Sequence, residues 1–388
     1  MVNESEIYSE MGNDEVHELV EGKDIEGLIN VLKYNKKSNC IKLAAYCLSG
    51  MGVEKAVAPL FELALKNKTG LFRRVAIVAL CNLGNHKAVE PLIYLMGKHD
   101  YLIGEIVEAV GNLKDDRAVK PLNMLMNDEN EEQDVREKAL ESLCKIGTQE
   151  AIADVIAILN KSSLDEKASV ALIELGEVVI QPLIKKMSSE NGIKVVEILG
   201  EIGSCQAAKP LLALFETYIT DDCIKKDSFE KPLIPIEIVR AIVKTNDALT
   251  IARTVEMLIN ALKPNPLHTD FDYTFQCSLI FALGEIQDKR VIKPLVQLLF
   301  QSDESRIVYT AAYALAMLGS KIDDPTVIKQ LTGVLEDARK YGNIRNFIAW
   351  ALLQTDENKA AIPLIKYLKY NYMEILRNTL FTSPDMLT

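Results

Sequence analysis

The residues best suited to hold a metal ion stand in a proline-broken stretch, KPNPLHTDFDYTF, at residues 263–275. His268, Asp270 and Asp272 alternate there, a spacing at which an extended loop presents one imidazole and two carboxylates to the same ion. Zinc sites usually take three or four protein ligands, and an aspartate at the end of a loop is also a common cap of the following helix. We favour the helix-cap interpretation and predict no metal site.

The seven cysteines form no CxxC pair and stand at positions 40, 47, 81, 144, 205, 223 and 277. An odd number spread over a long chain is typical of free thiols in a reducing compartment. Cys47, Cys81 and Cys144 share repeat positions with alanine, glycine and serine, so we expect them to pack as small apolar residues. Cys223 falls in a polar segment, and we expect it to be the most exposed thiol.

Other signatures of catalysis are missing from the sequence: it has no Walker-type lysine loop, dinucleotide fingerprint, GxSxG or HExxH. Asp115-Asp116 and Asp323-Asp324 are paired acids, but both pairs fall at expected turns, where aspartate caps helices. We therefore predict no catalytic residue and no cofactor, and we favour a protein that is not an enzyme.

The chain is acidic, with a formal net charge of −11 over 388 residues. A duplex-binding protein usually carries a basic stripe, so we expect no nucleic-acid partner. The N-terminal MVNESEIYSEMGNDE lacks the apolar core of a secretory signal, and no apolar stretch is long enough to span a bilayer. These features predict a cytoplasmic protein without a membrane partner, and they leave its oligomeric state open.

A repeat must position any site, and it is clearest over Arg73–Met126. Arg73–Met96 reads RRVAIVALCNLGNHKAVEPLIYLM and Ile103–Met126 reads IGEIVEAVGNLKDDRAVKPLNMLM, so that Pro91 and Pro121 stand thirty residues apart. Such a period indicates a stacked array of small units. Weaker copies extend the pattern on both sides, with a shortened one at 170–187 and a degenerate one at 236–262. We count about eleven.

Aligned copies show that each unit is a pair of helices. One column is strictly apolar: Leu48, Leu80, Val110, Leu143, Leu199, Leu283 and Leu315. The next column is small, which lets a neighbouring helix approach closely: Ser49, Cys81, Gly111, Cys144, Gly200, Gly284 and Ala316. Glycines that fit a left-handed turn end the first helix: Gly52, Gly84, Gly147, Gly176, Gly203 and Gly319. A proline then stands just inside the second helix in most copies.

These residues, ALGEIQDKRVIKPLVQLL above all, resemble the HEAT repeat family, particularly its short phycobilisome-lyase-like subclass. The resemblance covers nearly the whole chain and implies an all-α, right-handed α-α superhelix with second helices on the concave face and first helices on the convex face. HEAT-type deoxyhypusine hydroxylases hold iron with several His-Glu pairs in facing repeats. This chain has one such pair, His17-Glu18, so that activity is not expected.

We predict one solenoid over residues 1–388, with a frayed segment at 1–13 and a cap and tail at 371–388. Two loop insertions, 217–235 and 263–273, interrupt the repeat. They carry Phe229, Phe271 and Tyr273, which are more apolar than a solvated linker requires. Long loops in compact folds are often functional. These two either help clamp a partner or reflect the decay of one repeat.

A candidate binding column lies three residues past each proline. It is mixed and partly apolar: Glu62, Tyr94, Met124, Lys185, Gln297 and Lys366 belong to it. If it faces the groove, it suits a peptide or helix better than phosphate. We therefore predict a non-catalytic scaffold or adaptor that binds a partner protein or peptide. The alternative is a bilin-lyase-like protein that holds a tetrapyrrole or modifies a partner.

Overall fold

The computed structural model describes residues 4–66, 70–98, 101–187, 192–220, 234–262, 270–337, 341–342, 344–355 and 364–369. Over these ranges every regular element is a helix and no strand occurs, which confirms the predicted all-α fold. None of the described helices is long and apolar enough to cross a membrane.

The chain forms two compact units, Met1–Pro182 and Leu183–Thr388, where we expected one array. The boundary falls inside α13 (Ile180–Lys186), the second helix of the shortened copy. In an array each helix packs only on close neighbours, so no contact ties distant copies together. The sequence repeat therefore continues past a point where the packing divides.

The first unit begins with α1 and continues as helix pairs that end within α13. Its helices are α1 (Glu4–Glu10), α2 (Asn13–Glu21), α3 (Ile25–Tyr34), α4 (Ser38–Gly50), α5 (Val57–Lys66), α6 (Leu71–Asn82), α7 (Val89–Met96), α8 (Ile103–Leu113), α9 (Val119–Asn127), α10 (Gln133–Ile146), α11 (Gln149–Ala157) and α12 (Asp165–Leu175).

The second unit continues the pattern. Its helices are α14 (Gly192–Ile202), α15 (Cys205–Thr220), α17 (Ile234–Lys244), α18 (Ala248–Ala261), α19 (Asp270–Ile286), α20 (Ile292–Gln301), α21 (Ser305–Met317), α22 (Pro325–Glu336) and α24 (Arg345–Leu353). Residues 364–369 are also helical. Over the described ranges, complete pairs run from α2–α3 to α21–α22, and α24 begins a further one, in agreement with the predicted number.

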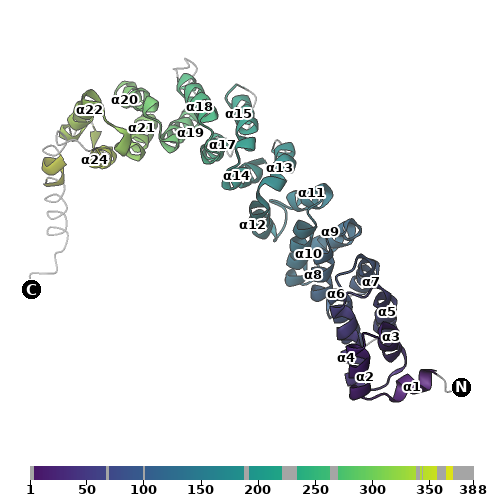
Figure 1. The fold of residues 1–388 in the computed structure, drawn as a ribbon. Helices are drawn as coiled ribbons and strands as arrows, with labels where there is room; N and C mark the ends of the chain where they lie inside the picture. Colours follow the sequence, from purple (N-terminus) through teal and green to yellow (C-terminus); the bar gives the residue numbers. More distant parts are fainter. Residues whose placement is uncertain are drawn as a thin grey trace, which may run out of the picture. The chain divides into compact units, whose positions relative to one another are not determined.

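Within each unit the first and second helices of the pairs form two layers (Figure 1). First helices pack on the next first helix, as α8 does on α10 and α19 on α21, and each second helix packs beside them. The strictly apolar column of the first helices is fully buried between the layers: Leu48, Leu80, Val110, Leu143, Leu199, Leu283 and Leu315 are all 0% exposed. The core therefore lies where the repeat pattern predicted it.

The small-residue column lets neighbouring first helices touch backbone to backbone. A Cβ added to Gly111 would lie 2.7 Å from the Cα atom of Ser142, and one added to Gly200 would lie 2.8 Å from the Cα atom of Ala241. Both distances are shorter than any side chain tolerates. Glycine is therefore required at these points for packing, which outweighs its cost of roughly 1 kcal/mol in a helix interior.

This close approach affects which layer lies inside the bend. In the second unit the row of pairs bends toward the first helices: α17, α19, α21 and α24 lie on the inner side and α18, α20 and α22 on the outer side (Figure 1). The family resemblance implied the opposite arrangement, which is wrong for this unit. The bend toward the first helices goes with their close packing, as at Gly200 and Gly284, where an added Cβ would lie 2.8 and 3.1 Å from a Cα atom of the next first helix.

The turns follow the predicted chemistry with one exception. Five of the predicted glycines have positive φ values, from 61° to 69°: Gly52, Gly84, Gly147, Gly176 and Gly203. Gly319 does not. A Cβ there would lie 2.7 Å from the carbonyl oxygen of Ala351, so Gly319 serves close packing and not a left-handed turn.

The predicted loop and end segments are shorter than expected. Residues 217–220 belong to α15 and residues 270–273 to α19, so both helices extend into the predicted insertions. The remaining parts, 221–233 and 263–269, lie outside the described residues, as does 371–388. At the N-terminus α1 is helical, and the Asn35 side chain donates hydrogen bonds to the carbonyl oxygens of Tyr8 (2.7 Å) and Met11 (3.2 Å). Within the predicted frayed segment 1–13, residues 4–10 thus form a helix that lies beside Asn35.

Candidate functional site

The predicted binding column is exposed and lies on the second helices, which form the outer layer of the second unit. Tyr94 is 48% and Met124 76% exposed, and the remaining members are exposed as well: Glu62, Lys185, Gln297 and Lys366. In the second unit, Gln297 lies on α20, in the outer layer. The column therefore does not line the inner side of that unit, and its role in binding stays a prediction.

The loop aromatics are placed only in part. Phe229 lies outside the described residues, and Phe271 is described only as part of the α19 backbone. Tyr273 stands on α19, and its ring lies 5.4 Å from the guanidinium carbon of Arg306 on α21. It is therefore a helix residue beside the inner layer and not part of an inserted loop.

The inner layer of the second unit carries exposed aromatic rings that the sequence analysis did not select. We call the set Phe281, Tyr309, Tyr313, Phe347 and Trp350, on α19, α21 and α24, the aromatic face. The rings of Phe281 and Tyr313 stack at 5.6 Å with an interplanar angle of 10°. The ring of Phe347 makes edge-to-face contacts with Tyr309 at 4.9 Å and with Tyr313 at 5.4 Å. One continuous set of ring contacts thus crosses three helices.

The aromatic face is open to solvent. Tyr309 is 48%, Tyr313 37% and Trp350 63% exposed, although tryptophan and tyrosine are large residues that bury most of their area in ordinary folds. On the opposite side of the same helices, Ala311, Leu315 and Leu352 are almost fully buried. The helices therefore bury one apolar stripe in the core and present a second one outward, which the fold itself does not need.

A repeat column could have revealed this face. Two positions before the buried apolar column stand Tyr46, Val78, Glu108, Glu141, Val170, Glu197, Arg240, Phe281, Tyr313 and Trp350. The column is aromatic only in the last three copies and at Tyr46. We overlooked it because we assigned the groove to the second helices, so the columns of the first helices were considered only for packing.

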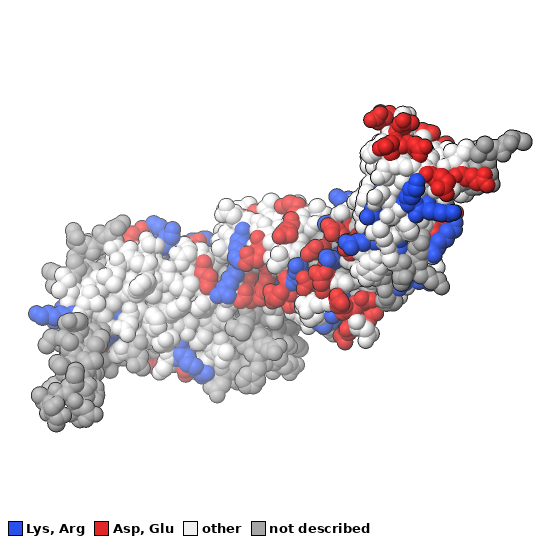
Figure 2. Space-filling model, turned by 90° about the horizontal axis from the view of Figure 1, so that it is seen from below, with Lys and Arg blue, Asp and Glu red and all other residues white. Residues whose placement is uncertain are grey.

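Charged residues border the aromatic face and are paired with one another. On the α17 side, Arg240 contacts Glu237 at 2.7 Å and Glu285 at 3.1 Å, and its guanidinium carbon lies 5.7 Å from the ring centre of Phe281. On the other border, Arg306 Nε donates to Glu304 at 3.0 Å. Figure 2 shows that the surface over the C-terminal helices is largely free of charged side chains. The face itself is thus neutral.

The same layer of the first unit has a different character. Glu108, Glu141 and Val170 occupy the corresponding column there, and Lys167 lies 3.3 Å from Glu137 and 3.4 Å from Glu141. Exposed ion pairs of this kind contribute roughly 0–1 kcal/mol each. This part of the layer is well solvated, so it gives less reason than the aromatic face to expect a bound partner.

The cysteines and acid pairs behave structurally where they are described. Burial raises the pKa of the Cys81 and Cys144 thiols to about 12, so both thiols stay protonated at neutral pH. Cys205 is exposed, and Cys223 lies outside the described residues. Asp115 accepts a hydrogen bond from the backbone N–H of Arg117 at 3.1 Å, as a turn cap does.

The candidate metal ligands do not form a site in the described part of the chain. Three or more His, Cys, Asp or Glu side chains able to hold an ion do not gather anywhere in it, and His268 lies outside it. His17 and Glu18 are exposed on α2, in the first unit. Asp324 caps α22, as predicted for the second acid pair.

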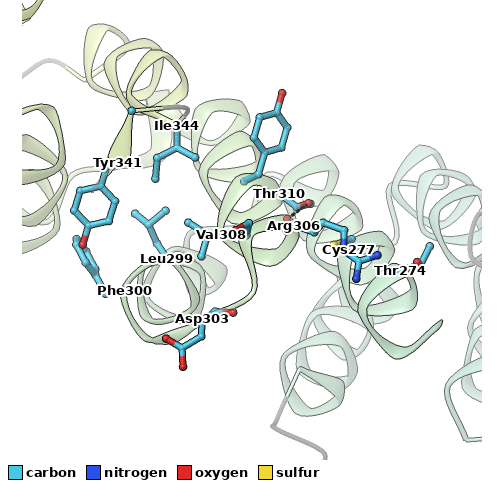
Figure 3. A pocket seen from close by; sticks show the side chains of 14 residues that line it. Thr274, Cys277, Leu299, Phe300, Asp303, Arg306, Val308, Thr310, Tyr341 and Ile344 are labelled. Carbon is cyan, nitrogen blue, oxygen red and sulfur yellow. Dashed lines mark hydrogen bonds between the residues drawn. The ribbon is translucent and has the colours of Figure 1, made fainter. Parts of the chain in front are cut away.

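A pocket of 870 Å³ opens beside the aromatic face (Figure 3). It lies among the last turn of α20, the first turns of α21, and Tyr341, Gly342 and Ile344, and it reaches Thr274 and Cys277 on α19. Tyr309 belongs both to the lining of the pocket and to the aromatic face. The pocket and the face are therefore continuous parts of one surface of the second unit.

Comparison with known proteins identifies the repeat. The family model for HEAT repeats matches residues 97–176 and 255–341. No curated protein sequence matches the chain.

Solved structures of low sequence identity also match the chain. Human deoxyhypusine hydroxylase in complex with glycerol is 18% identical, with a TM-score of 0.28 over 79% of this chain and 98% of that one. Kap121p bound to Pho4p is 14% identical, with a TM-score of 0.48 over 89% of this chain and 43% of that one. The CpcE–CpcF complex of phycocyanin lyase from Nostoc sp. PCC7120 is 16% identical, with a TM-score of 0.30 over 73% of this chain and 94% of that one. Likenesses this distant carry no information about activity. The family match itself places HEAT repeats in both compact units of this chain.

Proposed function

We propose that this protein is a non-catalytic scaffold that binds a segment of a partner protein on the aromatic face of its second unit. The exposed rings of Tyr309, Tyr313 and Trp350, with Phe347 packed against both tyrosines, carry the proposal. Tyrosine and tryptophan are the residues most enriched at binding hot spots. An apolar surface that the fold does not need is typical of an interaction site.

The exposed area of the rings limits how much binding free energy a partner can gain from covering them alone. The exposed parts of Tyr309, Tyr313 and Trp350 amount to roughly 300 Å² if each full side chain is about 200 Å². Covering them contributes about 7 kcal/mol at 25 cal/mol per Å², while association costs about 4–15 kcal/mol in lost motion and ordering. The three rings alone would therefore give a weak complex, and the partner segment must extend beyond them.

The chemistry of the face favours an apolar partner segment. Its bordering arginines are already paired with carboxylates, so a charged group placed over the rings would lose water without gaining a counter-charge. The free thiols of the described cysteines support a reducing compartment such as the cytoplasm. The segments 221–233 and 263–269 remain candidates for additional clamping contacts.

Selection from a random 12-residue peptide display library against the intact chain tests this function. Binding is then measured through the fluorescence of Trp350, which is the only tryptophan of the chain and should shift to the blue when it is covered. We expect selected peptides rich in apolar residues. Tyr309→Ala should weaken their binding about tenfold or more, which corresponds to at least 1.4 kcal/mol.

Tyr94→Ala is a matched control, because Tyr94 is also 48% exposed and also makes an edge contact with a neighbouring ring, that of Phe61 at 5.7 Å. It should leave binding unchanged. If Tyr94→Ala weakens binding and Tyr309→Ala does not, the second-helix column is the binding surface and the present proposal is wrong. A visible absorption band in the purified protein would instead favour the tetrapyrrole-binding alternative.

A further inference from the structure

The pocket beside the aromatic face has an apolar floor and a polar rim. Leu299 is 2% and Ile344 5% exposed, and Val308 is half-buried. The rings of Phe300, Tyr309 and Tyr341 stand around this floor, and the rings of Phe300 and Tyr341 contact each other edge to face at 6.1 Å. Figure 3 shows Leu299, Val308 and Ile344 together beside Phe300 and Tyr341.

Neither charged side chain of the pocket lining points at the apolar floor. Asp303 and Arg306 are the two charged residues among the residues that line the pocket. The carboxylate of Asp303 points away from Leu299 and Val308, and Arg306 extends toward Cys277 at the far end (Figure 3). Arg306 is also held by Glu304 at 3.0 Å and lies over the ring of Tyr273. A charged ligand group on the floor would therefore be desolvated without a partner.

We infer that this pocket binds an aromatic side chain of the partner segment, which enters beside Tyr309 while the rest of the segment covers the aromatic face. This inference rests on the proposed function and names the anchor residue that it requires. The neutral apolar floor matches an uncharged group, and the surrounding rings suit an aromatic ring, which favours edge-to-face contacts. The volume of 870 Å³ lies within the usual range of about 300–1,000 Å³ for ligand pockets, which leaves room for the anchor and its flanking backbone.

Isolated side-chain analogues test the anchor without a known partner. N-acetyl-tryptophanamide, N-acetyl-leucinamide and N-acetyl-lysinamide are titrated into the full chain, and binding is followed by saturation-transfer difference NMR. We expect the tryptophan analogue to bind, weakly as such small ligands do, and the lysine analogue not to bind. Val308→Phe places a ring on the floor and should weaken binding of the tryptophan analogue about tenfold.

The control is Val243→Phe, which adds the same ring at another half-buried valine, on α17 and outside the pocket lining. It should not change binding. If Val308→Phe does not fold, Ser305→Tyr narrows the pocket from an exposed position at the start of α21 and should also weaken binding.

Two results overturn the inference: no binding of the tryptophan analogue, or equal binding to the Val308→Phe and Val243→Phe proteins. If the lysine analogue binds more strongly than the tryptophan analogue, the inference of an uncharged anchor is likewise wrong. These outcomes are separable from failure of the proposed function. If binding of the selected peptides still depends on Tyr309 but no analogue binds, the aromatic face remains the binding site and only the anchor is ruled out.

Discussion

The close approach of neighbouring first helices can be tested at Gly111, where α8 meets α10. An alanine Cβ at this position would lie 2.4 Å from Ser142 Oγ, 2.5 Å from its Cβ and 2.7 Å from its Cα. Ser142 cannot turn away easily, because it is 1% exposed and its hydroxyl donates a hydrogen bond to the carbonyl oxygen of Val107 at 2.9 Å. The two helices must therefore move apart to accept Gly111→Ala.

The expected magnitude is the difference of two terms. Overpacking a core in this way costs about 1–3 kcal/mol, and contact with a backbone atom places this case at the upper end. The better helix propensity of alanine returns about 1 kcal/mol. We expect Gly111→Ala to lower the free energy of unfolding by about 2 kcal/mol, which at a urea slope of about 2 kcal/mol per M lowers the midpoint by roughly 1 M.

Gly333→Ala is the matched control, because a Cβ at Gly333 on α22 would meet nothing within 4 Å. Only the propensity term acts there, so this change should raise stability by about 0.5–1 kcal/mol. Circular dichroism during urea unfolding measures both proteins. If Gly111→Ala is as stable as Gly333→Ala, the helices are not in backbone contact at this position and the explanation of the small-residue column fails.

Two further predictions concern ionisable groups. The hydroxyl and N–H of Thr326 lower the pKa of Asp324 to about 2, so the Asp324 carboxylate stabilises the fold above about pH 4 and stops doing so as the pH falls toward 2. In wild type the urea midpoint should therefore decline over that pH interval, and Asp324→Asn should flatten the decline. An unchanged decline in the variant would contradict a stabilising cap at Asp324. Because burial raises the pKa of the Cys81 and Cys144 thiols to about 12, roughly one of these thiols in 10⁴ is ionised at pH 8. Iodoacetamide should therefore modify exposed Cys205 before Cys81 and Cys144; equal rates for the three in peptide mass spectrometry would contradict this expectation.

The first helices of the two units differ in the residues that they expose, and this difference has a consequence for specificity. The Lys167 ion pairs lie on the first unit and the aromatic rings on the second. A repeat array can vary its exposed columns freely because the buried columns alone hold the pairs together. Substitutions at Tyr313 or Trp350 should therefore alter binding with little effect on folding.

The sequence by itself determined the helix pairs, their core and most of their turns. The period of thirty residues, the buried leucine column and the turn glycines are local patterns, and each follows from the geometry of a single helix and its cap. Leu80, Leu143 and Leu283 are fully buried as predicted, because no other arrangement hides one apolar stripe in every copy. Gly319 departed from the pattern because its role depends on Ala351, which stands in the next repeat.

Only the tertiary structure decided which exposed column becomes a surface. Phe281, Tyr313 and Phe347 stand on three different helices, and their ring contacts exist because those helices pack side by side. The direction of the bend in the second unit likewise depends on the spacing within each layer, which is the sum of contacts between repeats. Periodicity within one helix fixes which side is buried, but it contains no information about the spacing to the next helix, and that spacing placed the aromatic face on the inner side.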